Sequence, residues 1–302
     1  MGSNFLEYTA CVICPSKEYI VLKAAQYSDD IDFIELLRGY RSSSEVKLMD
    51  QLVQCGDCGL TYTNPRFSST LAYQGYSEAI DVRHKEQEKY RQLSFKRAML
   101  KMRNFLDWGG QESRMRVLDV GCAGGAFLNA VRDSGHEAIG IEPSKYLSSY
   151  AREEHGLMVF SETLSDFSKN NSLPFDVITF WDVLEHISDP QVSLEIAREM
   201  LAKNGTLILN LPMIDTWPAK LLGSKWPFYL NVHLYYFNKN TIEKFLQKTG
   251  FQLEGMKMYT QTLSFGYILE RAGIGKASSG AFMSSIPFKY YLGQRTIIAR
   301  KV

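Results

Sequence analysis

Four cysteines near the start of the chain are spaced as metal ligands. Cys11 and Cys14 form one Cys-x-x-Cys pair, and Cys55 and Cys58 form a second. Two such pairs supply the tetrahedral four-sulfur set that is typical of structural zinc, whereas two unrelated buried pairs are the alternative. The intervening 40 residues exceed the spacer of common ribbons and must hold a hairpin or short helix, which we place at 31–37. Because four thiolates leave no open coordination position, we expect no catalysis at this metal.

A second stretch has the composition of a ligand-binding turn. Residues 116–120 form a short apolar run containing Asp119, and small residues follow before a helical pattern begins. A strand that passes through a Gly-rich turn into a helix brings the backbone close to a ligand. The dinucleotide spacing would need glycine at 121, 123 and 126, and only Gly121 meets it. The spacing G-x-G-x-G fits better, as Gly121, Ala123 and Gly125.

Further polar residues follow the strands that come after this turn. Glu142 ends an apolar run about 20 residues past the turn, where a doubly wound fold places a carboxylate on ribose hydroxyls. Thr163 and Leu164 lie in a loop that would flank an adenine. Asp182 and Val183 follow another apolar run. If these runs are parallel strands, all these side chains meet at the carboxyl edge of one sheet.

Alternating strands and helices would position these residues. Such alternation indicates an α/β fold with a parallel sheet covered on both faces. The strands are expected at 116–120, 137–141, 157–160, 175–180, 206–211, 251–260 and 294–301, and the helices at 125–134, 144–155, 190–203 and 239–249. Ahead of them, a helix rich in Lys and Arg is expected at 82–108. Its basic face is either simply exposed to solvent or attracts an acidic substrate.

The turn, Glu142 and the phrase from Phe175 to Ile187 (Phe-Asp-Val-Ile … Asp-Val-Leu-Glu-His-Ile) resemble the motifs of class I S-adenosylmethionine (SAM) methyltransferases. The resemblance covers residues from about 110 to 302 and implies a Rossmann-like, seven-stranded, mostly parallel sheet whose last strand is antiparallel. A zinc-ribbon-like module ahead of such a domain is similar to a bacterial arrangement whose members act on sugars, cell-surface glycans and natural products. The cofactor would contact Asp119, Gly121, Cys122, Ala123, Gly125, Phe127, Glu142, Thr163, Leu164, Asp182 and Val183.

These features divide the chain into three expected parts. Residues 1–67 form the zinc-ribbon-like module, 68–109 a helical linker or lid, and 110–302 the SAM-binding domain. An aromatic insertion at 212–237 follows the fifth strand, where this family builds acceptor pockets. It could instead be a small satellite core under a long loop.

Two histidines map to the same edge as the cofactor turn. A hydroxyl acceptor needs a base, and His233 inside the aromatic insertion is our first candidate, with His186 second. Some zinc-ribbon-bearing sugar C-methyltransferases resembling this chain have Glu where Val232 stands. O-methylation of a sugar or natural-product hydroxyl is therefore expected ahead of C- or N-methylation of a nucleotide-linked sugar.

Charge and hydropathy exclude some partners. The net charge is +1, and residues 1–65 carry five Lys/Arg against nine Asp/Glu, so docking to RNA is not favoured. An RNA methyltransferase and a non-catalytic SAM-fold scaffold remain the competing classes. With no run of about 18 apolar residues and no signal peptide, we expect a soluble, cytoplasmic protein acting on a small-molecule or glycan acceptor. The sequence does not indicate an oligomeric state.

Overall fold

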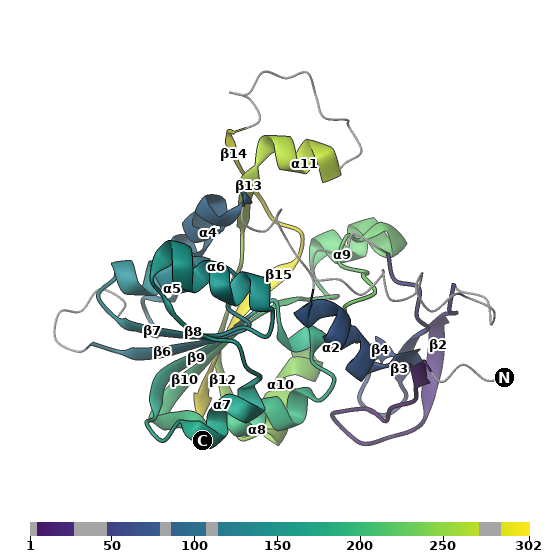
Figure 1. Cartoon of the computed structure of the whole chain (residues 1–302). Coiled ribbons are helices and arrows are strands. Elements are labelled where there is room, and N and C mark those ends of the chain that lie inside the picture. The colour runs from purple at the N-terminus through teal and green to yellow at the C-terminus, as the bar shows by residue number, and fades with distance from the viewer. Residues whose placement is uncertain (1–4, 27–46, 79–85, 107–113, 272–284) are drawn as a thin grey trace.

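The computed structural model describes residues 5–26, 47–78, 86–106, 114–271 and 285–302 (Figure 1). The helix or hairpin expected at 31–37 lies outside these residues. Of the basic helix expected at 82–108, the structure describes α4, Glu88–Met102.

A seven-stranded sheet forms the centre of the molecule (Figure 1). Its order is β12-β15-β10-β9-β6-β7-β8, and β15 is antiparallel to both of its neighbours. The predicted mostly parallel seven-stranded sheet with an antiparallel last strand is therefore confirmed. The strands are β6 (Arg116–Val120), β7 (Glu137–Ile141), β8 (Met158–Phe160), β9 (Phe175–Trp181), β10 (Leu201–Pro212), β12 (Phe251–Met258) and β15 (Gln294–Lys301).

Helices cover both faces of this sheet (Figure 1). One face carries α4, α5 (Ala126–Asp133) and α6 (Lys145–His155), and the other carries α7 (Leu164–Asn170), α8 (Pro190–Met200) and α10 (Lys239–Lys248). Successive strand residues point to opposite faces, so Val117 and Val177 pack under α4 and α5 while Leu118 and Ile178 pack under α7 and α8. Four of these helices, α6, α7, α8 and α10, begin after a residue whose side chain caps the helix by accepting a backbone N–H group of the first turn. The four capping residues are Ser144, Thr163, Asp189 and Asn238.

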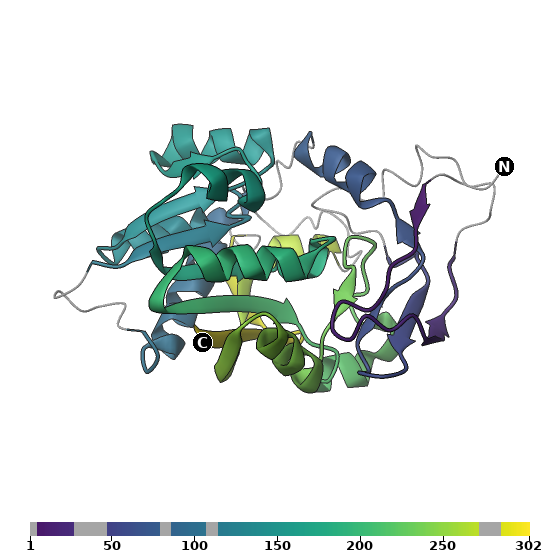
Figure 2. The same ribbon diagram turned by 90° about the horizontal axis from the view of Figure 1, so that it is seen from below.

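The N-terminal module is joined to the domain built on the seven-stranded sheet, the sheet domain, by a shared sheet. Its strands β2 (Tyr19–Lys23), β3 (Leu52–Cys55) and β4 (Thr61–Thr63) are completed by β11 (Tyr235–Tyr236), which comes from the insertion at 212–237. Ile13 and Tyr62 of the module also belong to the same buried hydrophobic cluster as Leu118 of β6. The module and the sheet domain, which the sequence analysis lists as two parts of the chain, therefore share one hydrophobic core. Figure 2 shows the module against one end of the sheet domain.

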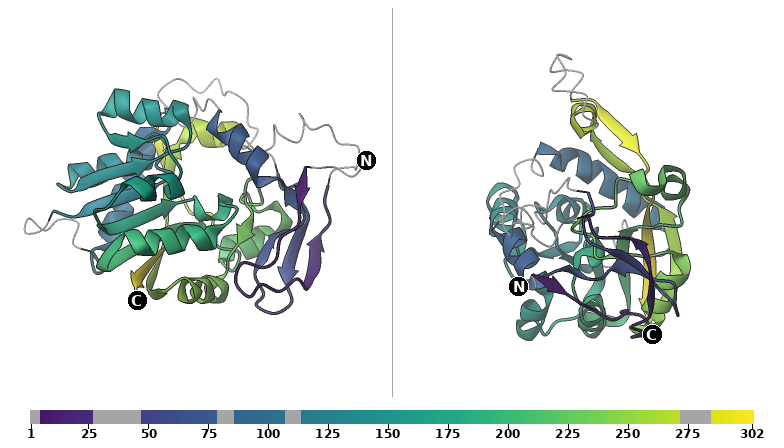
Figure 3. Two further views of the ribbon diagram at one scale, coloured as in Figure 1. Left: turned by 60° about the horizontal axis from the view of Figure 1, so that its bottom comes forward. Right: turned by 90° about the vertical axis from the view of Figure 1, so that its right-hand side faces the viewer.

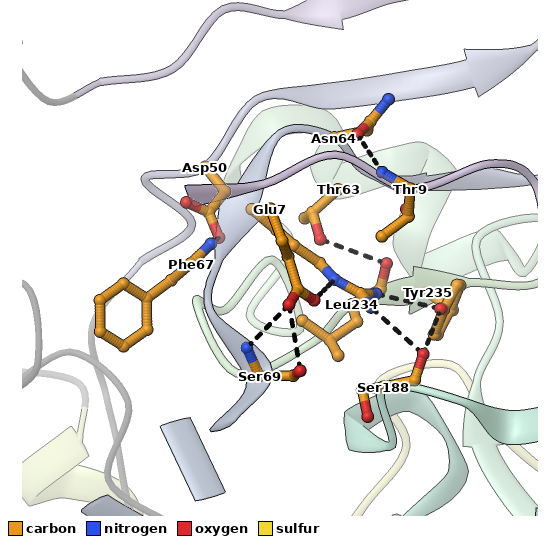
Figure 4. Close-up of polar contacts among 11 residues, drawn as sticks. Glu7, Thr9, Asp50, Thr63, Asn64, Phe67, Ser69, Ser188, Leu234 and Tyr235 are labelled. Carbon is orange, nitrogen blue, oxygen red and sulfur yellow. Dashed lines mark hydrogen bonds and ion pairs between the residues drawn. The ribbon is translucent and has the colours of Figure 1, made fainter. Parts of the chain in front are cut away.

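Arg66 anchors this junction through Glu7, Tyr235 and Ser188, which are labelled in Figure 4. It lies in β5 (Arg66–Phe67), which pairs with β1 (Leu6–Glu7), and its side chain is 3% exposed. Its guanidinium donates to the Glu7 carboxylate at 2.7 Å, to the Tyr235 hydroxyl at 3.0 Å and to the Ser188 carbonyl at 3.2 Å. The other Glu7 oxygen accepts from the backbone N–H and hydroxyl of Ser69, the first residue of α2 (Ser69–Ser77). One buried cation thus connects the module, α2 and the sheet domain.

A hairpin extends beyond the sheet domain (Figures 1 and 3). It consists of β13 (Gln261–Ser264) and β14 (Pro287–Tyr290), with α11 (Phe265–Arg271) following β13. Within the described ranges, the structure contains no helix with the length and hydropathy needed to cross a membrane.

Candidate functional site

A cavity of about 680 Å³ opens at the carboxyl edge of the sheet, between α2, α4, the Gly-rich turn and the insertion. Eight of the predicted site residues line it: Gly121, Ala123, Thr163, Leu164, Asp182, Val183, His186 and His233. The other five of the predicted cofactor and turn residues lie behind its wall: Asp119, Cys122, Gly125, Phe127 and Glu142. The predicted residues thus fall into eight that line the cavity and five that lie behind its wall.

The turn depends on glycine at two positions. Gly121 has φ +70°, and a Cβ there would lie 2.7 Å from Val183 Cγ2. Gly125 has φ +88°, and a Cβ there would lie 2.3 Å from Leu157 Cδ1. Both positions thus exclude other residues by conformation and by space. Ala123 also has positive φ, +47°, so the departure from glycine at this position carries backbone strain.

Two buried acids hold the turn in place. Asp119 accepts from the Thr179 hydroxyl at 2.6 Å, which ties β6 to β9. Glu142 accepts from the backbone N–H of Ala123 at 2.9 Å and of Ser144 at 2.8 Å. Burial raises the pKa of Asp119 to about 8, and burial also raises the pKa of Glu142 although its three donors oppose that shift.

Tyr76 on α2 is a site residue that the sequence analysis missed. Its hydroxyl donates to Glu142 Oε1 at 2.9 Å, so α2 closes over the carboxylate that we expect to meet a ribose. Glu142 is fully buried as a result. The signal in the sequence was the Tyr73–Tyr76 pair, but its contact with Glu142 spans 66 residues of chain.

Asp182 occupies the end of β9 in a strained conformation, with φ +55°. Its Oδ1 accepts from Asn210 Nδ2 and from Gln294 Nε2, both at 2.7 Å, which fixes the carboxylate against β10 and β15. Burial raises its pKa to about 6, while these donors and the positive charge of Arg91 oppose the shift. Oδ1 of Asp182 is therefore held on the cavity wall by two amide donors.

His186 and His233 lie side by side, with ring centroids 4.7 Å apart and an interplanar angle of 79°. His186 Nδ1 lies 2.8 Å from the Val232 carbonyl. Because a carbonyl can only accept, this Nδ1 carries the proton and Nε2 retains its lone pair. Desolvation by the cavity walls lowers the pKa of His186 to about 4, and burial lowers that of His233 well below its ordinary value. Both shifts favour the neutral form of the rings.

Glu185 completes this histidine cluster, and sequence reasoning did not single it out. It is 1% exposed, and burial, followed by the charge of Asp182, raises its pKa well above its ordinary value. Glu185 Oε2 and His233 Nδ1 are buried without a hydrogen-bond partner among the described residues. One ligand atom from each of Glu185, His186 and His233 lies within 4.8 Å of the others. These three residues can exchange a proton with a bound acceptor, or could hold a divalent cation.

The aromatic insertion is mostly a satellite core, the alternative that the sequence left open. Trp226 and Tyr236 pack with Leu48 and Leu52, and Trp217 is 61% exposed at the surface. Of the aromatic and histidine side chains in this segment, Phe228 and His233 line the cavity. The Phe228 ring stacks on His233 at 6.1 Å, so the insertion positions the histidine more than it forms an aromatic wall.

The four cysteine sulfurs converge as predicted. All lie within 4.8 Å of one another, with Cys11 Sγ 3.4 Å from Cys58 Sγ and Cys14 Sγ 3.4 Å from Cys55 Sγ. Burial raises the pKa of the Cys11 thiol to about 11. At Cys55, backbone hydrogen bonds from Cys58 and Asp57 outweigh burial and lower the pKa to about 7. Four clustered sulfurs with this spacing fit a tetrahedral zinc ion.

Residues 84–254 match a family model described as a methyltransferase domain. This match covers more than half of the chain. The chain belongs to this methyltransferase family. The predicted membership in the class I SAM-dependent methyltransferases is thus confirmed, together with the fold.

Individual relatives match part of the chain. A ubiquinone biosynthesis O-methyltransferase from Methylococcus capsulatus is 35% identical over 120 residues, which are 38% of this chain and 50% of the relative. One from Actinobacillus pleuropneumoniae is 34% identical over 105 residues, or 32% and 44% of the two chains. The chain thus spans about half the length of these relatives. A chain from the complex of the Haloferax volcanii Trm112 methyltransferase activator with a methyltransferase is 13% identical, with a TM-score of 0.50 over 72% of this chain and 92% of that chain, and shares the fold.

Proposed function

We propose that this protein transfers a methyl group from SAM to a hydroxyl of a small-molecule or glycan acceptor, most simply a sugar or natural-product hydroxyl. The observation that carries the proposal is that the Gly-rich turn and the His186–His233 pair open into one cavity. Cofactor site and base are thus within reach of one acceptor. The relatives named as O-methyltransferases of ubiquinone biosynthesis support a hydroxyl on a small molecule.

The residues of the turn and of β7 would hold the cofactor. Backbone at Gly121 and Ala123 lines the cavity closely enough for a ligand to lie against it. Glu142, at the end of β7, would accept from the ribose hydroxyls once the Tyr76 hydroxyl gives up its place on Oε1. Thr163 and Leu164 line the part of the cavity where the adenine would lie. When bound, SAM supplies an electrophilic methyl group, so the protein must mainly align the acceptor and exclude water.

His233 would remove the proton from the acceptor hydroxyl. A neutral imidazole with an unpartnered, buried Nδ1 is prepared to accept a proton. His186 would hold the loop at Val232 through Nδ1 and present Nε2 beside His233. Glu185, kept protonated by burial, would place no negative charge beside His233, and the proton taken up by His233 would pass to solvent after the product leaves.

Replacing Glu142 with alanine tests the cofactor site. The variant should bind S-adenosylhomocysteine (SAH) more weakly by about 1–3 kcal/mol, the scale of lost hydrogen bonds to a charged group. The control is Glu137→Ala, at the other end of the same strand, where the carboxylate pairs with Arg116 at 3.2 Å. Calorimetric titration with SAH measures both variants, and unchanged affinity in Glu142→Ala would remove Glu142 from the cofactor site.

We also propose one structural zinc ion per chain, held by Cys11, Cys14, Cys55 and Cys58. Metal analysis of freshly purified, reduced protein should find about one zinc per chain, and a metal-free preparation would refute the site. Chelation should lower the thermal stability of the whole chain, since β11 and the buried cluster join the module to the sheet domain. A chelated protein whose sheet domain unfolds at its original temperature would contradict this coupling.

A further inference from the structure

The loop that carries His233 is held by the N-terminal module on both sides of this histidine. Before it, the backbone N–H of Leu48 donates to the Tyr229 carbonyl at 3.0 Å. After it, Thr63 donates to the Leu234 carbonyl from its backbone N–H at 3.0 Å and from its hydroxyl at 3.4 Å (Figure 4). The strand β11 then continues the sheet of the module. The module thus determines where the segment around the proposed base lies.

Between these two contacts, the chain makes a turn that ends at His233. The backbone N–H of His233 donates to the Leu230 carbonyl at 3.1 Å, so Asn231 and Val232 are the two central residues of the turn. The carbonyl of Val232 lies 2.8 Å from His186 Nδ1, which fixes this residue from the side of the sheet domain. Asn231 is the central residue that contacts the module.

Asn231 is fully buried, and its side chain makes one hydrogen bond to a residue 182 positions away. Its Oδ1 accepts from the backbone N–H of Met49 at 2.5 Å, whereas its Nδ2 is buried without a hydrogen-bond partner among the described residues. A buried donor without an acceptor costs free energy, so an amide is a poor choice if this position only fills the core. What the side chain supplies is one acceptor for the module, two residues before His233.

We propose that Asn231 is a positioning residue for His233. It fixes the turn against the module, so that the His233 ring stays at the cavity wall. Leu230, Val232 and His233 line the cavity and Asn231 does not, so its effect passes through the histidine and not through contact with a ligand. Misplacing a reacting group by about 1 Å can cost about 10²-fold in rate, so one hydrogen bond at this turn can control turnover. This inference rests on the proposed function for the role of His233 as the base.

Replacing Asn231 with leucine tests this role, because leucine has nearly the same shape and cannot accept a hydrogen bond. With methyl-labelled SAM and a hydroxyl acceptor that the parent methylates, Asn231→Leu should lower kcat about tenfold or more. The KM for SAM and the affinity for SAH should be unchanged. Asn231→Asp, which retains an oxygen at the same place, should recover part of the rate. Asn231→Ala removes the same acceptor and replaces the leucine variant if that variant does not fold.

Combination with His233→Ala separates positioning from a general loss of structure. If Asn231 acts through His233, adding Asn231→Leu to His233→Ala should cause no further loss of kcat. A further loss of the same size would overturn the proposal, as would the parent rate in Asn231→Leu or a matching loss of SAH affinity. The control is Asn64→Leu, which should keep the parent kcat. Asn64 is 3% exposed, and its Oδ1 accepts from the backbone N–H of Thr9 at 2.9 Å within the module.

A spectroscopic measurement tests the same point without an acceptor. Protein labelled with ¹⁵N-histidine and saturated with SAH gives ring signals that are assigned by their loss in single histidine variants. Asn231→Leu should shift or broaden the signals of His233 and leave those of His136 unchanged, and unaltered His233 signals would overturn the proposal. If His233→Ala turns over at the parent rate, the proposed base is wrong, while these signals still show whether Asn231 positions the ring.

Discussion

Replacing His233 with alanine is expected to lower kcat by about 10²–10⁴-fold, the usual contribution of a general base, and to leave SAH affinity unchanged. The physical reason is that a free hydroxyl is a weak nucleophile, and His233 is a neutral, buried imidazole with an unpartnered Nδ1 at the cavity wall. Initial rates with methyl-labelled SAM and a hydroxyl acceptor that the parent methylates provide the measurement.

Two further variants make the result specific. His136→Ala is the control. His136 has the same exposed fraction as His233, 4%, but it precedes β7 at the opposite edge of the sheet. His186→Ala removes the second ring, whose Nδ1 holds the Val232 carbonyl. If His233→Ala turns over at the parent rate and His186→Ala does not, the base is His186. If both retain the parent rate, the acceptor needs no base and catalysis is alignment alone.

Arg66→Met is expected to destabilise the whole chain by about 3 kcal/mol, the lower end of the range for breaking a buried ion pair, since Glu7 is 30% exposed. The loss should appear in one cooperative transition, because Arg66 contacts the module, Tyr235 of β11 and Ser188 after β9 (Figure 4). Urea unfolding followed by circular dichroism and tryptophan fluorescence measures both the loss and the cooperativity.

The matched control for this variant is Lys169→Met, which breaks an exposed pair with Asp166 and should cost less than about 1 kcal/mol. Two separate transitions in Arg66→Met, with the sheet domain as stable as in the parent, would show that the module and the domain unfold independently. That outcome would contradict the structural role we assign to the shared sheet.

Local patterns made much of the fold predictable. The strands at 137–141 and 294–301 were predicted with the bounds that the structure has, and the apolar run that starts at Arg116 forms β6, Arg116–Val120. The turn was predictable because Gly121 and Gly125 occupy positions where a side chain would clash. Residues near each other in sequence determine these features, so composition and spacing were sufficient.

Contacts distant in sequence were not predictable in the same way. The pairing of β11 with β4 joins residues separated by more than 170 positions, and nothing in the Tyr235–Tyr236 dipeptide indicates its partner. Aromatic content did not distinguish the satellite core around Trp226 from a pocket wall, because both need large apolar side chains. The sequence also did not distinguish Arg91 from its basic neighbour Lys96, which pairs with Asp133, whereas the buried Nε of Arg91 has no hydrogen-bond partner within the described residues.

The central claim, that the cavity beside the Gly-rich turn binds SAM, is tested most directly by calorimetric titration of the parent protein with SAH. Since the turn, Glu142 and the cavity are formed in the folded chain, we predict saturable binding of one SAH per chain. The parent must first be shown to be folded, by a cooperative unfolding transition. If it then takes up no SAH at concentrations up to about 1 mM, the weak end of specific affinity, the account is contradicted.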